Sequence, residues 1–184
     1  MFFATALLAS AQADTAPLAT GETYRLVFTD VDRNQLSTAD GHVTIIIVTT
    51  RQQEEKARAL GDRVPEEFVG DPKYRCVTVI NFQGRIHPAF RAVTNALIRH
   101  RLNQEAKRIQ PRYSKAHLTR DPRHDLFAVA DFDGTALNQL GLAPSLTEFA
   151  AFIFDGAGRL LRRWSEVPAQ SELAEALATA KPRG

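Results

Sequence analysis

The stretch FAAFIFDGAGRLLRRWS, from Phe149 to Ser165, decides the fold of this chain. Two largely apolar runs flank Gly156-Ala157-Gly158, and a short connection rich in glycine between such runs is typical of a β-hairpin. Strands that are joined by a tight hairpin must be antiparallel. Any sheet that contains this segment therefore ends in an antiparallel pair of strands.

Strands and helices alternate upstream of the hairpin. The strands predicted from β-branched and apolar runs are YRLVF at 24–28, HVTIIIV at 42–48, YRCVTVINF at 74–82 and LFAVADF at 126–132. Helices are predicted after the second strand up to Gly61, from Ala89 to about Ile109, and at 171–180. Because strands separated by helices form right-handed parallel crossovers, the fold class is α/β, with parallel core strands and an antiparallel hairpin plus a helix at the end.

Composition describes an ordinary globular chain with one core. The sequence has 184 residues, of which 44% are hydrophobic and 24% are charged, with a net charge of +2. This charge is too small to indicate a polyanionic partner, and nucleic acid is not expected as one. No apolar run approaches the ~18 residues that a membrane span requires. With one cysteine, Cys76, the chain cannot form an internal disulfide.

The N-terminal segment predicts export. MFFATALLASAQA, residues 1–13, is apolar and ends in Ala11-Gln12-Ala13, which fits the small-residue pattern before a signal-peptidase cleavage site. It lacks a positively charged start, so the signal is atypical or truncated. We expect residues 1–13 to be a signal peptide, 14–23 a flexible segment and 24–184 a single domain, located in the periplasm or secreted.

The segment DFDGT, Asp131 to Thr135, raises one enzymatic alternative. A strand followed by D-x-D-G-T resembles the start of haloacid-dehalogenase-type phosphatases, and this resemblance implies Asp131 as nucleophile and Asp133 as proton donor. That chemistry also needs a cation and further carboxylates for Mg²⁺ from later parallel strands. Only 49 residues follow Thr135, and two predicted strands among them form the hairpin. The alternative reading is a strand that ends in an Asp-Gly turn.

Three phrases in order resemble the thioredoxin-like superfamily of exported thiol oxidoreductases and peroxiredoxins. DGHVTIIIVTT resembles the strand before its active-site helix. LFAVADFDGTALNQLGL resembles the strand and turn before its cis-proline loop, and AAFIFDGAGRLLRRWSEVP resembles its closing hairpin. The resemblance covers roughly residues 24 to 180 and implies a three-layer sandwich.

The resemblance also implies where the family's reactive groups belong. Its two C-x-x-C cysteines correspond to Gln53 and Lys56, and a peroxidatic T-x-x-C corresponds to Thr50 and Gln53. The cis-proline corresponds to Phe149, while Pro144 lies five residues earlier. We call residues 49–56 the active-site-equivalent loop. It contains no thiol, so exchange chemistry at this place is not expected.

The contact residues expected for binding share this end of the fold. They are Thr49, Thr50, Arg51, Gln52, Gln53, Lys56 and Phe149. Backbone N–H groups at the start of the helix, with Arg51 beside them, suit a carboxylate or phosphate. No catalytic residue, cofactor or metal is assigned.

Other patterns predict no strong site. Asp30-Val31-Asp32-Arg33-Asn34 opens like a calcium loop but lacks the required glycine and glutamate, so a polar hairpin or loop is expected. The basic stretch 99–123 is interpreted as a solvated face, and the five histidines show no metal-ligand spacing.

The sequence therefore predicts a redox-inactive binding or adaptor protein of the cell envelope, with a protein partner. The alternatives are a degenerate peroxiredoxin or thiol oxidoreductase that uses Cys76, and the phosphatase. Cys76 lies within an apolar strand, where a thiol is usually a buried hydrophobic group with a raised pKa.

Overall fold

A computed structural model describes residues 16–82, 86–143, 145, 148–180 and 182. The main sheet has five strands in the order β5-β4-β3-β6-β7. These strands are β3 (Val43–Thr49), β4 (Tyr74–Asn81), β5 (Leu126–Asp131), β6 (Ala150–Phe154) and β7 (Leu160–Trp164). The first three run parallel, whereas β6 is antiparallel to β3 and β7 to β6. The mixed sheet that the sequence predicts is confirmed.

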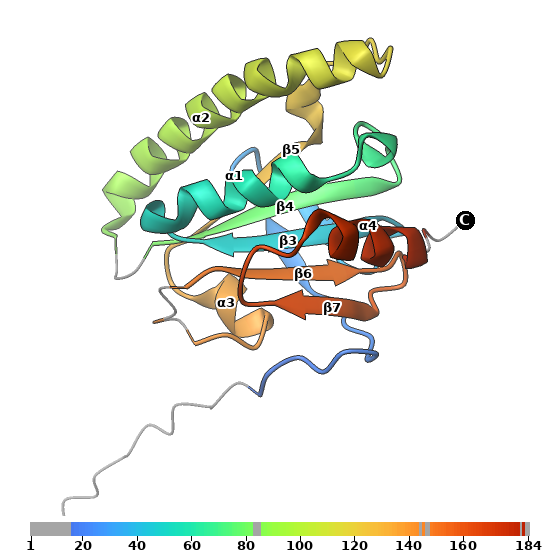
Figure 1. Cartoon of the computed structure of the whole chain (residues 1–184). Coiled ribbons are helices and arrows are strands. Elements are labelled where there is room, and N and C mark those ends of the chain that lie inside the picture. The colour runs from blue at the N-terminus through green and yellow to red at the C-terminus, as the bar shows by residue number, and fades with distance from the viewer. Residues whose placement is uncertain (1–15, 83–85, 144, 146–147, 181, 183–184) are drawn as a thin grey trace, which may run out of the picture.

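The sheet is the middle of three layers (Figure 1). One face carries the helices α1 (Glu54–Arg63), α2 (Pro88–Lys115) and α4 (Gln170–Thr179). The other face carries α3 (Thr135–Gln139) and a small hairpin of β1 (Val27–Thr29) and β2 (Gln35–Ser37). Three short 3₁₀ turns connect these elements: η1 (Arg51–Gln53), η2 (Glu66–Phe68) and η3 (Pro122–Asp125). No helix within the described ranges is long and apolar enough to cross a membrane.

Strand β3 forms the centre of the core. All seven of its residues are buried, and they alternate between two clusters. Ile45 and Ile47 pack with Leu60 of α1 and with α4, while Ile46 and Val48 pack with α3 and the small hairpin. Each large aliphatic side chain that is fully buried contributes roughly 1.5–3 kcal/mol relative to its exposed state. The burial of both faces explains the uninterrupted run of β-branched residues.

Helix α2 is longer than the sequence predicts. It continues to Lys115 through Pro111, although a proline inside a helix costs roughly 3 kcal/mol. Contacts from residues after Pro111 hold the last turns. Tyr113 Oη donates a hydrogen bond of 2.6 Å to Asp125, and Arg112 donates one of 2.6 Å to the Val64 carbonyl. The prediction that this helix ends near Ile109 is therefore wrong, because the helix continues to Lys115.

The chain before β1 is attached to the sheet over its described part. The Gly21 N–H donates to the Leu160 carbonyl at 2.7 Å, and the Leu160 N–H donates to the Glu22 carbonyl at 2.9 Å. Leu18 also packs against the core. Residues 16–23 thus cover the edge of β7, where the sequence suggested flexibility. The expected signal peptide, residues 1–13, lies outside the described residues.

Candidate functional site

The active-site-equivalent loop begins where β3 ends, with two buried threonines. Thr49 is 3% exposed and Thr50 is 4% exposed. The Thr49 hydroxyl donates to the Thr50 carbonyl at 3.2 Å, and the Thr50 hydroxyl donates to Gln52 Oε1 at 3.4 Å. Arg51 and Gln52 follow in η1 and are exposed. Of the expected contact residues, these two are the ones whose side chains are exposed to solvent.

The positions that correspond to the family's two cysteines have other roles. The Gln53 N–H closes the 3₁₀ turn onto the Thr50 carbonyl at 3.1 Å. Lys56 Nζ lies 2.7 Å from the Glu166 carboxylate and ties α1 to the loop after β7. The loop therefore closes the end of the fold through hydrogen bonds and one ion pair.

Phe149 does not lie on the contact surface. It is 1% exposed and packs in the cluster that α1 and α4 form with the sheet. In the position of a family cis-proline, this chain thus has a buried aromatic core residue. No peptide bond is cis in the part of the chain that the structure describes, and Pro144 lies outside that part.

A cleft of about 720 Å³ opens beside the active-site-equivalent loop. Its mouth includes Thr50 and Arg51, and Ala57 of α1 lines one wall. Leu97 and Leu102 of α2 line the opposite wall. We call this space the α1–α2 cleft. Its volume falls within the roughly 300–1,000 Å³ that is typical of ligand pockets.

The floor of the cleft is the face of strand β4 that lies on the same side of the sheet as α1, α2 and α4 (Figure 1). Along this strand buried residues alternate with half-buried ones, and the half-buried set faces α2. Thr78 and Ile80 of this set line the cleft. Strands inside a parallel sheet are normally covered on both faces. Here α2 covers the strand only in part, through the cluster in which Ile80 packs with Ile98 and Leu102.

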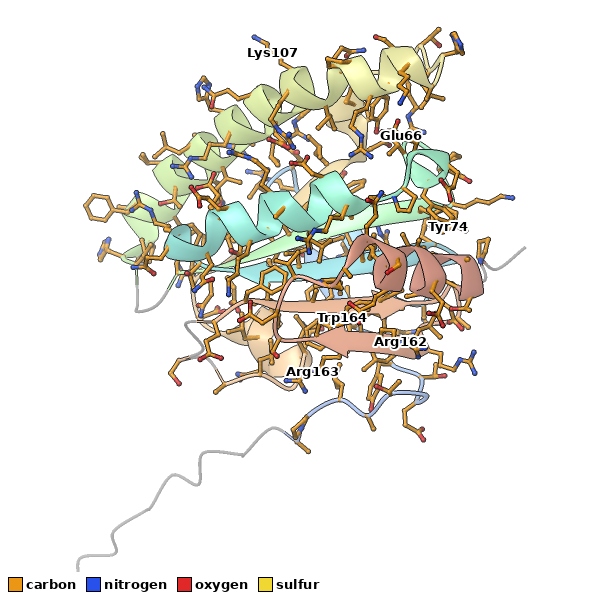
Figure 2. All side chains as sticks on the ribbon, in the orientation of Figure 1. Glu66, Tyr74, Lys107, Arg162, Arg163 and Trp164 are labelled. Carbon is orange, nitrogen blue, oxygen red and sulfur yellow. The ribbon has the colours of Figure 1, made fainter. Side chains whose placement is uncertain are left out.

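Charged side chains join α1 and its following turn to α2 above the cleft. Glu54 pairs with Arg101 at 2.6 Å, and Asp62 pairs with Arg108 at 2.7 Å. Arg58 and Glu105 approach to 3.8 Å, and Glu66 lies 3.2 Å from Arg112. We call these four contacts the ion-pair ladder. In Figure 2, Glu66 lies below the C-terminal part of α2, whereas Lys107 points outward from that helix.

The basic stretch 99–123 is therefore largely engaged within the molecule. Besides the ladder, Arg99 donates to the Val31 carbonyl at 2.6 Å. Arg120 pairs with Asp125, and Arg123 pairs with Asp32. The interpretation as a simple solvated face missed these contacts, because their partners lie up to 91 residues away in the sequence.

Cys76 lies in the middle of the protein and not at the active-site-equivalent loop. It belongs to β4, pairs with Ile45 and lines an apolar cavity of about 120 Å³. Its side chain is half-buried by surface exposure but densely surrounded by protein, and this desolvation raises the pKa of its thiol to about 12. Since the thiolate is the nucleophile, Cys76 is poorly suited to exchange or peroxide chemistry at neutral pH.

The DFDGT segment forms a structural cap. Asp131 is 3% exposed, and its carboxylate accepts the Leu137 N–H of α3 at 2.9 Å. The Asp133 carboxylate accepts the Thr135 N–H at 3.1 Å, and Gly134 adopts φ +81°. Hydrogen bonds from the Thr135 side chain and amide lower the pKa of Asp133, and Arg91 adds to this effect. Strand β5 is moreover an edge strand, so no later parallel strand lies beside it to complete a phosphatase site.

The Asp30–Asn34 segment is the turn of the β1–β2 hairpin. Asp30 Oδ1 accepts the N–H groups of Asp32 at 2.9 Å and Asn34 at 2.7 Å, and Arg33 has φ +70°. The carboxylate that would begin a calcium loop is thus used by the turn. Among the described residues, no group of three or more His, Cys, Asp or Glu side chains is arranged to hold a metal ion.

Comparisons with known proteins identify the architecture. No protein-family model and no curated protein matches the sequence. Among solved structures, the exposed lipoprotein thioredoxin of Streptococcus pneumoniae aligns with TM-score 0.50 and 14% identity over 84% of this chain and 98% of its own. A peroxiredoxin-like protein from Aquifex aeolicus aligns with TM-score 0.50 and 12% identity over 90% of both chains.

A thiol-disulfide oxidoreductase from Bacteroides fragilis aligns with TM-score 0.50 and 10% identity over 85% of this chain and 97% of its own. At these identities the likeness concerns the fold alone. The sequence contains one cysteine and no C-x-x-C. The chain has a thioredoxin-like fold whose active-site-equivalent loop carries no thiol.

Proposed function

We propose that this protein is a redox-inactive thioredoxin-like binding or adaptor protein of the cell envelope. Its contact surface is the active-site-equivalent loop together with the neighbouring side of α2. The observation that carries the proposal is the α1–α2 cleft beside a loop that has no thiol. The end of the fold that performs chemistry in thiol oxidoreductases is available here for binding.

An apolar stripe on α2 supports a protein as the partner. Phe90, Val93 and Leu97 are 64%, 58% and 59% exposed, and their spacing places them on one helix face. Leu97 also lines the cleft that Arg51 borders. Exposed apolar groups that cluster in this way are typical of interaction surfaces. The stripe and the loop together form a continuous contact area.

Site-specific cross-linking in the producing cell tests this contact. We expect a photoreactive amino acid in place of Gln52 to give a discrete cross-linked product. The same amino acid in place of the exposed Arg162 should give none. Arg162 lies on β7, at the edge of the sheet that is farthest from α2 in Figure 2. The substitutions Val93→Asp and Leu97→Asp should abolish the product, while Lys107→Asp on the outer side of α2 should keep it. Equal products from both cross-linker positions would reject the surface.

Export is part of the proposal. It is supported by the signal-like composition of residues 1–13 and by the similarity of the fold to a thioredoxin described as an exposed lipoprotein. We expect the mature chain to begin near Asp14. Fractionation of cells and mass measurement of the N-terminal peptide test this, and an uncleaved chain in the cytoplasm would contradict it.

A further inference from the structure

We propose that the α1–α2 cleft binds a long-chain fatty acid, with its acyl chain along β4 and its carboxylate at Arg51. The proposal goes beyond the protein contact described above, because it concerns the interior of the cleft. It starts from the partly covered face of β4, where Thr78 and Ile80 are half-buried although Ile80 packs in the cluster that contains Ile98 of α2.

The shape of this region suits a single chain. The cleft lies over β4, with Thr49 of β3 and Ala128 of β5 at its sides, and the smaller cavity around Cys76 continues along β4, with Arg108 lining both spaces. From Cys76 to Phe82 the strand extends roughly 20 Å at 3.3 Å per residue. A narrow space of this length along a strand matches an extended acyl chain.

The chemistry of the lining favours an acyl chain over a peptide. Ala57, Ile80, Leu97, Ile98 and Leu102 line the cleft. Strand β4 is hydrogen-bonded to β3 on one side and β5 on the other, so its backbone has no free edge to pair with a peptide. A peptide in this space could pair its N–H and C=O groups only with polar side chains of the lining, such as Thr78, Thr94 and Gln104, whereas an acyl chain needs no such partners.

The charges at the mouth favour an anionic head group. The cleft is lined by four arginines, Arg51, Arg58, Arg101 and Arg108, against two glutamates, Glu54 and Glu105. The last three arginines take part in the ion-pair ladder. Arg51 has no hydrogen-bond or ion-pair partner among the described residues. Its guanidinium is therefore available to bind a carboxylate in a charge-assisted hydrogen bond.

Titration calorimetry of the whole protein with sodium dodecanoate tests the proposal. We expect saturable binding of one molecule per chain. Dodecyltrimethylammonium, which has the same chain length and a positive head group, should bind more weakly. Arg51→Gln should weaken dodecanoate binding about tenfold, as expected for the loss of one charge-assisted hydrogen bond. The matched variant Arg162→Gln, on the exposed part of β7, should bind as the unmodified protein does.

Larger side chains that fill the cleft provide an independent test of the proposal. Thr78→Phe on its floor should abolish saturable binding, and Leu102→Trp on the α2 wall provides a second blocking variant if the first does not fold. Circular dichroism confirms folding of each. No saturable binding to the unmodified protein, or unchanged binding to both folded variants, would overturn the proposal. Equal affinity for the cationic amphiphile would overturn the assignment of the head group. None of these results depends on the cross-link at Gln52.

Discussion

At the scale of single residues, an ion pair between the buried Arg75 and the solvent-exposed Asp40 joins β4 to the segment between β2 and β3. Arg75 of β4 is 8% exposed and donates to both carboxylate oxygens of Asp40, at 3.0 and 3.1 Å. It also donates to the Ser37 carbonyl at 2.7 Å and to the Thr44 hydroxyl at 3.0 Å. One side chain thus fixes the connection between the small hairpin and the main sheet.

Replacement of Asp40 tests how much this ion pair contributes to the free energy of unfolding. Asp40→Asn leaves the buried Arg75 without its counter-ion, but the Asp40 side chain is itself 31% exposed, so we expect the free energy of unfolding to fall by about 1–3 kcal/mol. The control is Asp62→Asn, which breaks a ladder pair whose carboxylate is 46% exposed, and which should cost less than about 1 kcal/mol. Urea denaturation measures both, and equal losses would contradict this account.

The same pair predicts a dependence of stability on pH. Partial burial acts to raise the pKa of Asp40, but hydrogen bonds from Arg75 and His42 outweigh it and lower the pKa from 3.8 to about 2. The folded state therefore gains stability from the ionised carboxylate above about pH 4, and this gain is lost as the pH falls toward 2. The stability difference between the unmodified protein and Asp40→Asn should shrink over this interval. A constant difference would exclude the carboxylate as its source.

Substitutions of Asp131 distinguish a structural role of this residue from a catalytic one. Asp131→Ala leaves the buried Leu137 N–H without an acceptor, which should cost about 1–3 kcal/mol. Asp131→Asn retains an oxygen acceptor and should cost less. Thermal unfolding of the two variants measures this order. A Mg²⁺-dependent phosphomonoesterase activity that Asp131→Asn abolishes would contradict the structural role.

At the scale of elements, the attachment of α2 is unusual. Helix α4 presents three buried side chains to the sheet, Leu173, Ala176 and Leu177. Helix α2 has 28 residues and buries Ile98, Ala106 and Tyr113, while the ion-pair ladder joins it to α1 and η2. Over its 28 residues the long helix thus buries no more side chains than the 10-residue α4, and charge pairs that contribute little in salt supply part of its attachment.

Hydrogen exchange tests this attachment. In about 1 M salt, where the screening length is ~3 Å, we expect amide exchange in α2 to accelerate about fivefold, which corresponds to roughly 1 kcal/mol of lost pairing. Exchange in α4 should change little, since apolar packing holds that helix. Equal salt sensitivity in the two helices would contradict the role of the ladder.

At the scale of the whole molecule, local patterns determine most of the architecture. The hairpin at Gly156–Gly158 and the β-branched run 42–48 predicted the mixed sheet and its buried centre, because both depend on neighbouring residues. The cleft could not be predicted, because its lining comes from α1, α2 and the sheet, which are far apart in the sequence. The ladder pairs could not be predicted either, because they join residues 46 to 47 apart in the sequence. The end of α2 was predicted too early, because distant contacts outweigh the local helix-breaking effect of Pro111.

The central claim is that this thioredoxin-like protein binds without thiol chemistry, and the reactivity of Cys76 tests it most directly. With its pKa raised to about 12 by burial, the native thiol should not react with an aromatic disulfide reagent at pH 7 while the protein remains folded. The same chain unfolded in guanidinium chloride should react completely. Reaction of the native protein as fast as the unfolded chain, lost in Cys76→Ser, would contradict the claim.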